Sequence, residues 1–172
     1  MKKQYLGLII VISIILIFTL SFILYNEWPL MTGKTMVLQT TPVDPFDPFM
    51  GQYMTIRYEI SSVNKTVDAT INDPIYIILQ EDNEGIWRNI GVSKQKPTNQ
   101  DFIKGKIEKI YTNSLIIDYG IEQFYFERGA DLPTTNITIE VKVASSGRAR
   151  ISQMLHNNEP INIEYDKFSI KD

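Results

Sequence analysis

The threonine and lysine side chains are the groups in this sequence that could serve as nucleophile and base. A membrane-anchored hydrolase of the signal-peptidase kind needs a serine or threonine just beyond its anchor and a desolvated lysine on a strand. No serine lies between Trp28 and Phe49, and no motif places a threonine beside a lysine. We therefore assign no catalytic residue and keep a Ser/Thr-Lys hydrolase as the alternative hypothesis. The residues it could use are Thr32, Thr35, Thr40, Thr41, Lys104 and Lys106.

Metal-binding residues are few. Residues 81–85 cluster oxygen ligands, but they lack the alternating pattern and distal glutamate of a calcium loop, so a hairpin turn is expected there. His156 is the single histidine and the chain has no cysteine, which leaves zinc without a set of imidazole or thiolate ligands. We expect no metal, no cofactor and no disulfide.

The least ordinary stretch is the tandem Asp-Pro-Phe repeat at residues 44–49. Each proline forces the preceding aspartate toward extended geometry, which excludes a continuous helix. A polyproline-like turn repeats every three residues and would place Phe46 and Phe49 on one side. Two interpretations stay open: the rings fill the core, or they form an aromatic patch that touches the bilayer or a partner.

If the octapeptide at residues 51–58 forms a regular strand, its side chains point alternately to the two faces of the sheet. Ile56 and Tyr58 then point toward the core, while Tyr53 and Arg57 point the other way. The structural interpretation is a strand entry, with Gly51 in a tight turn. The functional interpretation is a ligand or partner surface around Tyr53 and Arg57.

The N-terminus predicts a transmembrane anchor. No charged residue occurs from Tyr5 to Tyr25, and roughly 20 apolar residues are what a helix needs to cross a bilayer. Lys2 and Lys3 precede this stretch and Glu27 follows it, so the positive-inside rule places the N-terminus in the cytoplasm. A cleaved signal peptide is the competing interpretation, but its apolar region would be shorter.

The rest of the chain is expected to be mainly β, an antiparallel sandwich or barrel of about eight or nine strands. Residues 137–143 and 54–60 alternate apolar and polar side chains, as half-buried strands do, and residues 160–165 do so over a shorter length. Residues 75–79 form a continuous apolar run, which predicts a strand covered on both faces. Residues 94–101 are polar and predict an exposed loop.

These patterns predict four parts: a cytoplasmic tip (1–4), a transmembrane anchor (5–25), a stalk (26–34) and an extracytoplasmic β domain (35–172). The part after the anchor carries 15 basic and 20 acidic side chains, a formal charge of −5. An acidic domain without a basic cluster is a poor partner for nucleic acid.

Three blocks of the sequence resemble the bacterial GDYxxLxY family. The first is Gly51-Gln-Tyr-Met-Thr-Ile-Arg-Tyr58, the second is Tyr119-Gly-Ile-Glu122 leading to a turn at Gly129, and the third is Gly147-Arg-Ala149 after a strand. Gly51, Tyr58, Gly120, Glu122 and Gly129 are the motif residues. The chain departs from the pattern at Gln52 and at Arg128, where relatives carry acids. The resemblance implies an N-terminal anchor, an outer domain, an unknown molecular activity and a polytopic membrane protein as partner.

We therefore expect a membrane-anchored interaction module that binds the bilayer through residues 5–25. A pocket that holds a threonine against Lys104 or Lys106 would instead favour the hydrolase.

Overall fold

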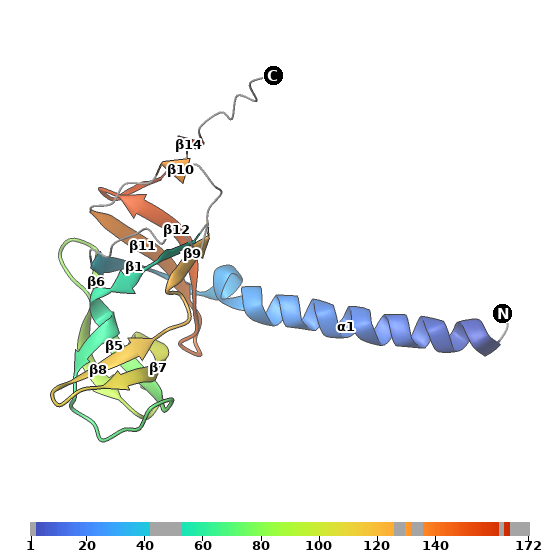
Figure 1. The fold of residues 1–172 in the computed structure, drawn as a ribbon, viewed down its shortest axis with the longest axis horizontal. Coiled ribbons are helices and arrows are strands. Elements are labelled where there is room, and N and C mark those ends of the chain that lie inside the picture. Colours follow the sequence, from blue (N-terminus) through green and yellow to red (C-terminus); the bar gives the residue numbers. More distant parts are fainter. Residues whose placement is uncertain (1–2, 42–52, 126–129, 132–135, 162–163, 166–172) are drawn as a thin grey trace.

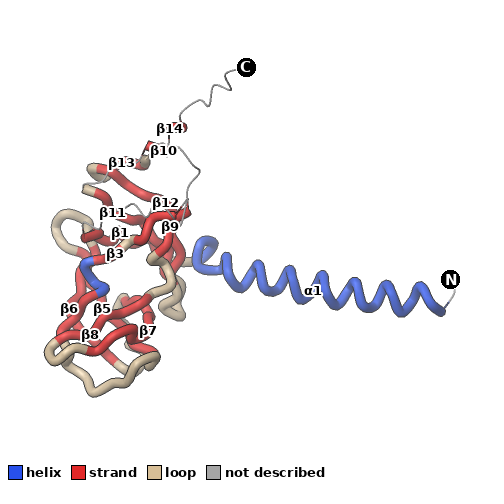
Figure 2. The backbone as a smooth tube through the Cα atoms, viewed as in Figure 1, coloured by secondary structure: helices blue, strands red, loops and turns tan. Residues whose placement is uncertain are grey.

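The computed structural model describes residues 3–41, 53–125, 130–131, 136–161 and 164–165, which form one long helix and a β domain (Figures 1 and 2). Helix α1 (Lys3–Thr32) projects away from the domain, and from Tyr5 to Tyr25 its apolar side chains are exposed on every side. Its segment Tyr5–Thr32 is long and apolar enough to cross a membrane, and no other helix in the described ranges is. The helix continues past Tyr25, so most of the segment expected as a stalk is helical.

The first sheet has five antiparallel strands. Their order is β13 (Glu159–Pro160), β12 (Ala149–His156), β11 (Ile137–Val143), β1 (Lys34–Thr41) and β3 (Arg57–Tyr58). Strand β1 begins two residues after α1 ends and pairs at once with the end of β11, Lys34 opposite Val143. The β11–β12 hairpin therefore lies beside the end of the helix (Figure 1).

The second sheet also has five antiparallel strands. Their order is β4 (Ser62–Asn64), β8 (Ser114–Asp118), β7 (Phe102–Ile110), β5 (Pro74–Glu81) and β6 (Trp87–Ser93). A short 3-10 helix, η1 (Glu59–Ser61), connects the first sheet to this one. Two small ribbons complete the described fold: β2 (Tyr53–Thr55) pairs with β9 (Gln123–Tyr125), and β10 (Ala130–Asp131) pairs with β14 (Glu164–Tyr165).

Both sheets contribute to one hydrophobic cluster. Leu38 and Ile139 of the first sheet and Ile77 and Ile103 of the second are fully buried in it. A parallel bridge between Val37 and Ile86 also connects β1 to the residue before β6. The mainly β fold with one N-terminal apolar helix is thus confirmed.

Several local predictions are confirmed and others differ. Strand β11 has the predicted bounds, and residues 94–101 are a largely exposed loop. The described chain has fourteen strands rather than eight or nine, because seven of them are only two or three residues long.

Two predicted strands are interrupted. The predicted strand at 54–60 breaks at Ile56 and gives way to the 3-10 turn at Glu59. Residues 160–165 are likewise not one strand: β13 ends at Pro160 and β14 begins at Glu164.

The prediction that residues 75–79 are covered on both faces is wrong. Ile75, Ile77 and Leu79 are buried, whereas Tyr76 and Ile78 on the other face are only partly covered. The cover over Tyr76 includes an edge-on contact with the Phe102 ring, with centroids 5.6 Å apart. The apolar outer face of β5 is therefore shielded by neighbouring side chains rather than by a second layer.

Candidate functional site

The octapeptide and the Tyr-Gly-Ile-Glu block lie side by side in the fold. Strand β2 pairs with β9 in a register that sets Tyr53 opposite Tyr125 and Thr55 opposite Gln123. The backbone N–H of Ile56 continues the contact by donating to the carbonyl of Glu122 at 2.6 Å. The first two sequence blocks thus form one structural unit, the motif site.

Tyr58 is the buried centre of the motif site. Its side chain is 1% exposed, and its hydroxyl donates to the Ile121 carbonyl at 2.6 Å. Burial, followed by the nearby Glu122 charge, raises the pKa of Tyr58 well above its usual range. The phenol therefore stays neutral and acts as a structural donor. Tyr58 and Ile56 are both buried, as the alternation predicts.

Tyr119 makes the reciprocal contact. Its buried hydroxyl donates to the carbonyl of Ile60 at 2.6 Å, which ties the second block to η1. Its ring packs over Gly105, where an added Cβ would lie only 2.9 Å from the ring edge. Gly120 follows with a φ of 75°, a conformation that glycine adopts without steric cost.

Glu122 holds the turn of the second block closed. One carboxyl oxygen accepts the N–H of Tyr119 at 2.6 Å and the other accepts the N–H of Ile121 at 2.8 Å. Burial, together with a hydrogen bond to Asp118, raises the pKa of Glu122 to about 7, although the two backbone donors oppose the shift. This carboxyl can therefore gain or lose a proton near neutral pH.

A cavity of about 550 Å³ opens beside Glu122. Thr55 and Arg57 are exposed at its rim, and Asp118 and Lys109 also line it. The cavity can accept a polar or charged group from a partner.

Of the other residues singled out from the sequence, one has only its backbone described and four lie outside the described ranges. Tyr53 lies in β2, but only its backbone is described. Phe46, Phe49, Gly51 and Gly129 lie outside the described residues, and their roles stay predictions.

The threonines considered for a hydrolase are engaged elsewhere. Thr40 donates to the Ile137 carbonyl at 2.6 Å, Thr41 to that of Arg57 at 3.2 Å and Thr32 to that of Trp28 at 3.1 Å. Thr35 accepts a bond from the half-buried Lys142 at 2.5 Å. This bond lies at an exposed position, so Lys142 is not the desolvated lysine that such a mechanism needs. Lys104 and Lys106 are exposed on β7.

A second notable region is the junction between α1 and the domain, which the sequence analysis did not identify. Pro29 has no N–H, so the carbonyl of Tyr25 lacks its usual helical donor. The Arg148 guanidinium donates to that carbonyl at 3.1 Å and stacks on the Tyr25 ring, 4.0 Å from its centroid. Arg150 pairs with Glu27 at 2.8 Å. The third sequence block and the residue that follows it thus contact the last turns of the helix.

The chain turns sharply between the helix and β1. Gly33 donates to the Pro29 carbonyl at 2.8 Å, and an added Cβ at Gly33 would lie 2.3 Å from that oxygen and 2.9 Å from the backbone nitrogen of Val143. A glycine is required here because of this close approach. The signals available in the sequence were Pro29 within the helix and the Gly147-Arg-Ala149 block.

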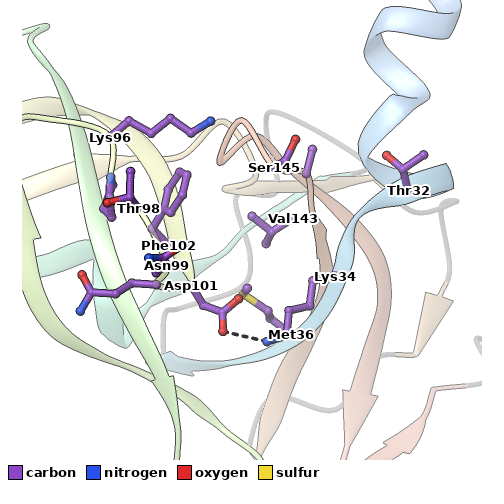
Figure 3. Close-up of a pocket in the computed structure, with 13 residues that line it drawn as sticks. Thr32, Lys34, Met36, Lys96, Thr98, Asn99, Asp101, Phe102, Val143 and Ser145 are labelled. Carbon is purple, nitrogen blue, oxygen red and sulfur yellow. Dashed lines mark hydrogen bonds and ion pairs between the residues drawn. The ribbon is translucent and has the colours of Figure 1, made fainter.

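A cavity of about 760 Å³ lies at this junction, between the end of α1, the start of β1 and the loop 96–101 (Figure 3). Lys34 crosses it to pair with Asp101 at 2.7 Å, and its ammonium lies 4.5 Å from the Trp87 ring centroid.

No curated protein and no solved structure matches the chain. A family model described as GDYXXLXY protein matches residues 15–154, which include the last part of α1 and all three sequence blocks. The chain therefore belongs to the GDYXXLXY family.

Proposed function

We propose that this protein is a single-pass membrane protein of the bacterial envelope whose outer β domain binds another membrane protein. The N-terminus is cytoplasmic in this proposal, because Lys2 and Lys3 precede the apolar segment and Glu27 follows it. The β domain is then extracytoplasmic, and the helix remains attached as an anchor.

The observation that carries the proposal is the docked junction of α1 with the β11–β12 hairpin. An anchored enzyme that acts on soluble substrates needs only a loose tether. A domain that must meet a partner in the same bilayer gains from a fixed height and orientation, because fewer degrees of freedom are lost on binding. The contacts of Arg148 with Tyr25 and of Arg150 with Glu27 supply that fixation.

The motif site is suitably placed to receive such a partner. Along the direction of α1, strand β9 lies at the end of the domain near the helix, whereas β6 lies far from it (Figure 1). Thr55 and Arg57 are exposed at the adjoining cavity, while Tyr58 and Tyr119 fix the backbone beneath them. A polar cavity lined in part by strand β9 suits a loop of an integral membrane protein.

Site-specific photo-crosslinking in intact cells tests this proposal. A photoreactive amino acid at position 55 should give a crosslinked product with an integral membrane protein. The same amino acid at position 90, exposed on β6 away from the helix, is the matched control. Equal products at both positions, or none at position 55, would argue against the motif site as the contact.

A further inference from the structure

The position of the junction relative to a lipid bilayer follows from the length of the uncharged segment of α1. The 21 residues from Tyr5 to Tyr25 extend about 31 Å as a helix, close to the roughly 30 Å hydrocarbon core of a bilayer. If α1 spans a bilayer, the Tyr25 ring lies at the boundary on the side of the β domain. The Arg148 guanidinium, stacked on that ring, then lies among the lipid headgroups.

Positive charge gathers at this end of an otherwise acidic domain. Lys142 and Arg150 are direct cross-strand neighbours, an arrangement of like charges that is unfavourable without anions nearby. Glu27 compensates Arg150 and Asp101 compensates Lys34. Within the described ranges, no carboxylate forms an ion pair with Lys96, Lys142 or Arg148, which also lie at this end.

The cavity at the junction adds a place for a headgroup to sit. Thr32 and Ser145 line it near the helix, Lys96 extends toward Ser145 from the opposite side, and the Lys34–Asp101 pair lies below them (Figure 3). The Lys96 ammonium lies 5.9 Å from the Phe102 ring centroid. It forms no ion pair with a carboxylate of the described residues, so its N–H groups can donate to an anion. The hydroxyl group of Ser145 offers a further donor to an oxyanion, whereas that of Thr32 already donates to the Trp28 carbonyl. A volume of about 760 Å³ is in the range of small-molecule sites.

We propose that this cavity and the neighbouring cations bind the headgroup of an anionic phospholipid. Lys96, which lines the cavity, contacts the phosphate, and Arg148 adds positive charge at the end of α1. The acyl chains stay in the bilayer beside Tyr25 and Trp28, which are both exposed on α1. An anionic lipid surface attracts each nearby lysine or arginine by about 1 kcal/mol, which corresponds to about a fivefold change in affinity. The site requires α1 to lie in a bilayer, or in a detergent micelle that replaces one, but requires neither the protein partner nor the orientation proposed above.

The test is a titration of the full chain in non-ionic detergent micelles with dioctanoyl phosphatidylglycerol, followed by the thermal unfolding midpoint. Ligand that binds only the folded state raises this midpoint, and the rise increases with the logarithm of ligand concentration once that concentration exceeds the Kd. Dioctanoyl phosphatidylcholine and inorganic phosphate are the comparison ligands. Lys96→Gln tests the cavity, and Lys106→Gln, the same charge change on the exposed face of β7, is the matched control.

We expect phosphatidylglycerol to raise the midpoint more than either comparison ligand does. Lys96→Gln should weaken its apparent affinity about fivefold, and Lys106→Gln should leave it unchanged. An equal response to inorganic phosphate would identify a site for the free anion, and an equal response to phosphatidylcholine would show that headgroup charge is not recognised. An equal loss of affinity in both lysine variants would show that binding depends on the overall charge of the domain and not on this cavity. Each of these three results would overturn the proposal, while failure of the crosslinking experiment would not affect it.

Discussion

The motif site and the helix junction are stabilised by contacts of opposite kinds. In the motif site, the buried hydroxyls of Tyr58 and Tyr119 donate to backbone carbonyls. At the junction, the partly exposed guanidinium of Arg148 stacks on Tyr25 and donates to its carbonyl. Buried contacts cost much to remove and exposed ones cost little, so the first region should determine whether the domain folds and the second how it is oriented.

The largest expected effect is at Tyr58. Tyr58→Ala should lower the free energy of unfolding by roughly 3–5 kcal/mol, because it leaves a cavity in the core. Tyr58→Phe keeps the ring but leaves the Ile121 carbonyl without its donor, and should cost about 1–3 kcal/mol. Denaturant unfolding of the full chain measures both changes. A wild-type midpoint for Tyr58→Ala would show that its burial does not stabilise the fold.

An intermediate effect is expected from Glu122 and depends on pH. Its pKa is raised from 4.5 to about 7 in the folded state. Between these two pH values the folded protein keeps a proton on Glu122 that the unfolded chain has lost. Stability from this group is fully present below pH 4.5, falls as the pH rises through 7, and is constant above that. Unfolding at pH 5 and pH 8 should show the wild type to be less stable at pH 8.

The matching variant is Glu122→Gln. Its amide oxygen can accept only one of the two backbone N–H groups, so the variant should be less stable at pH 5 and should lose most of the pH dependence. Glu108→Gln changes an exposed carboxyl that lines the same cavity and should keep the dependence. An unchanged slope in Glu122→Gln would assign the titration to another group.

The smallest effect on stability is expected from Arg148→Ala. The guanidinium contacts are only partly buried, so their loss should cost about 1 kcal/mol or less. The helix should nevertheless move more freely relative to the domain, because the Tyr25 carbonyl and ring lose their shared partner. A loss of several kcal/mol would instead make the junction part of the folding core.

The sequence predicted the elements whose patterns are local. The alternation at 137–143 gave the bounds of β11, and the alternation around Ile56 placed Tyr58 in the core. The resemblance identified the three blocks but could not show that Tyr58 reaches Ile121, because that contact joins residues 63 positions apart. The continuous apolar run at 75–79 was misleading. Its outer face is apolar because Tyr76 packs against neighbouring side chains such as Phe102, and no second layer covers it.

The junction was missed for a related reason. Pro29 indicates only that a helical carbonyl lacks its donor, and nothing local says that Arg148, more than a hundred residues away in sequence, supplies one. The like charges of Lys142 and Arg150 become neighbours only through the register of β11 with β12. Such features depend on long-range strand pairing, which local periodicity does not specify.

The most direct test of the docked junction is a distance measurement between spin labels in the full chain, reconstituted in lipid nanodiscs. The chain has no cysteine, so single cysteines at Leu20 on α1 and Ile90 on β6 can be labelled without other changes. We predict one narrow distance distribution for the otherwise wild-type chain and a broad one when Arg148 and Arg150 are both changed to alanine. A broad distribution in the wild-type background would contradict the fixed orientation of the domain on its helix.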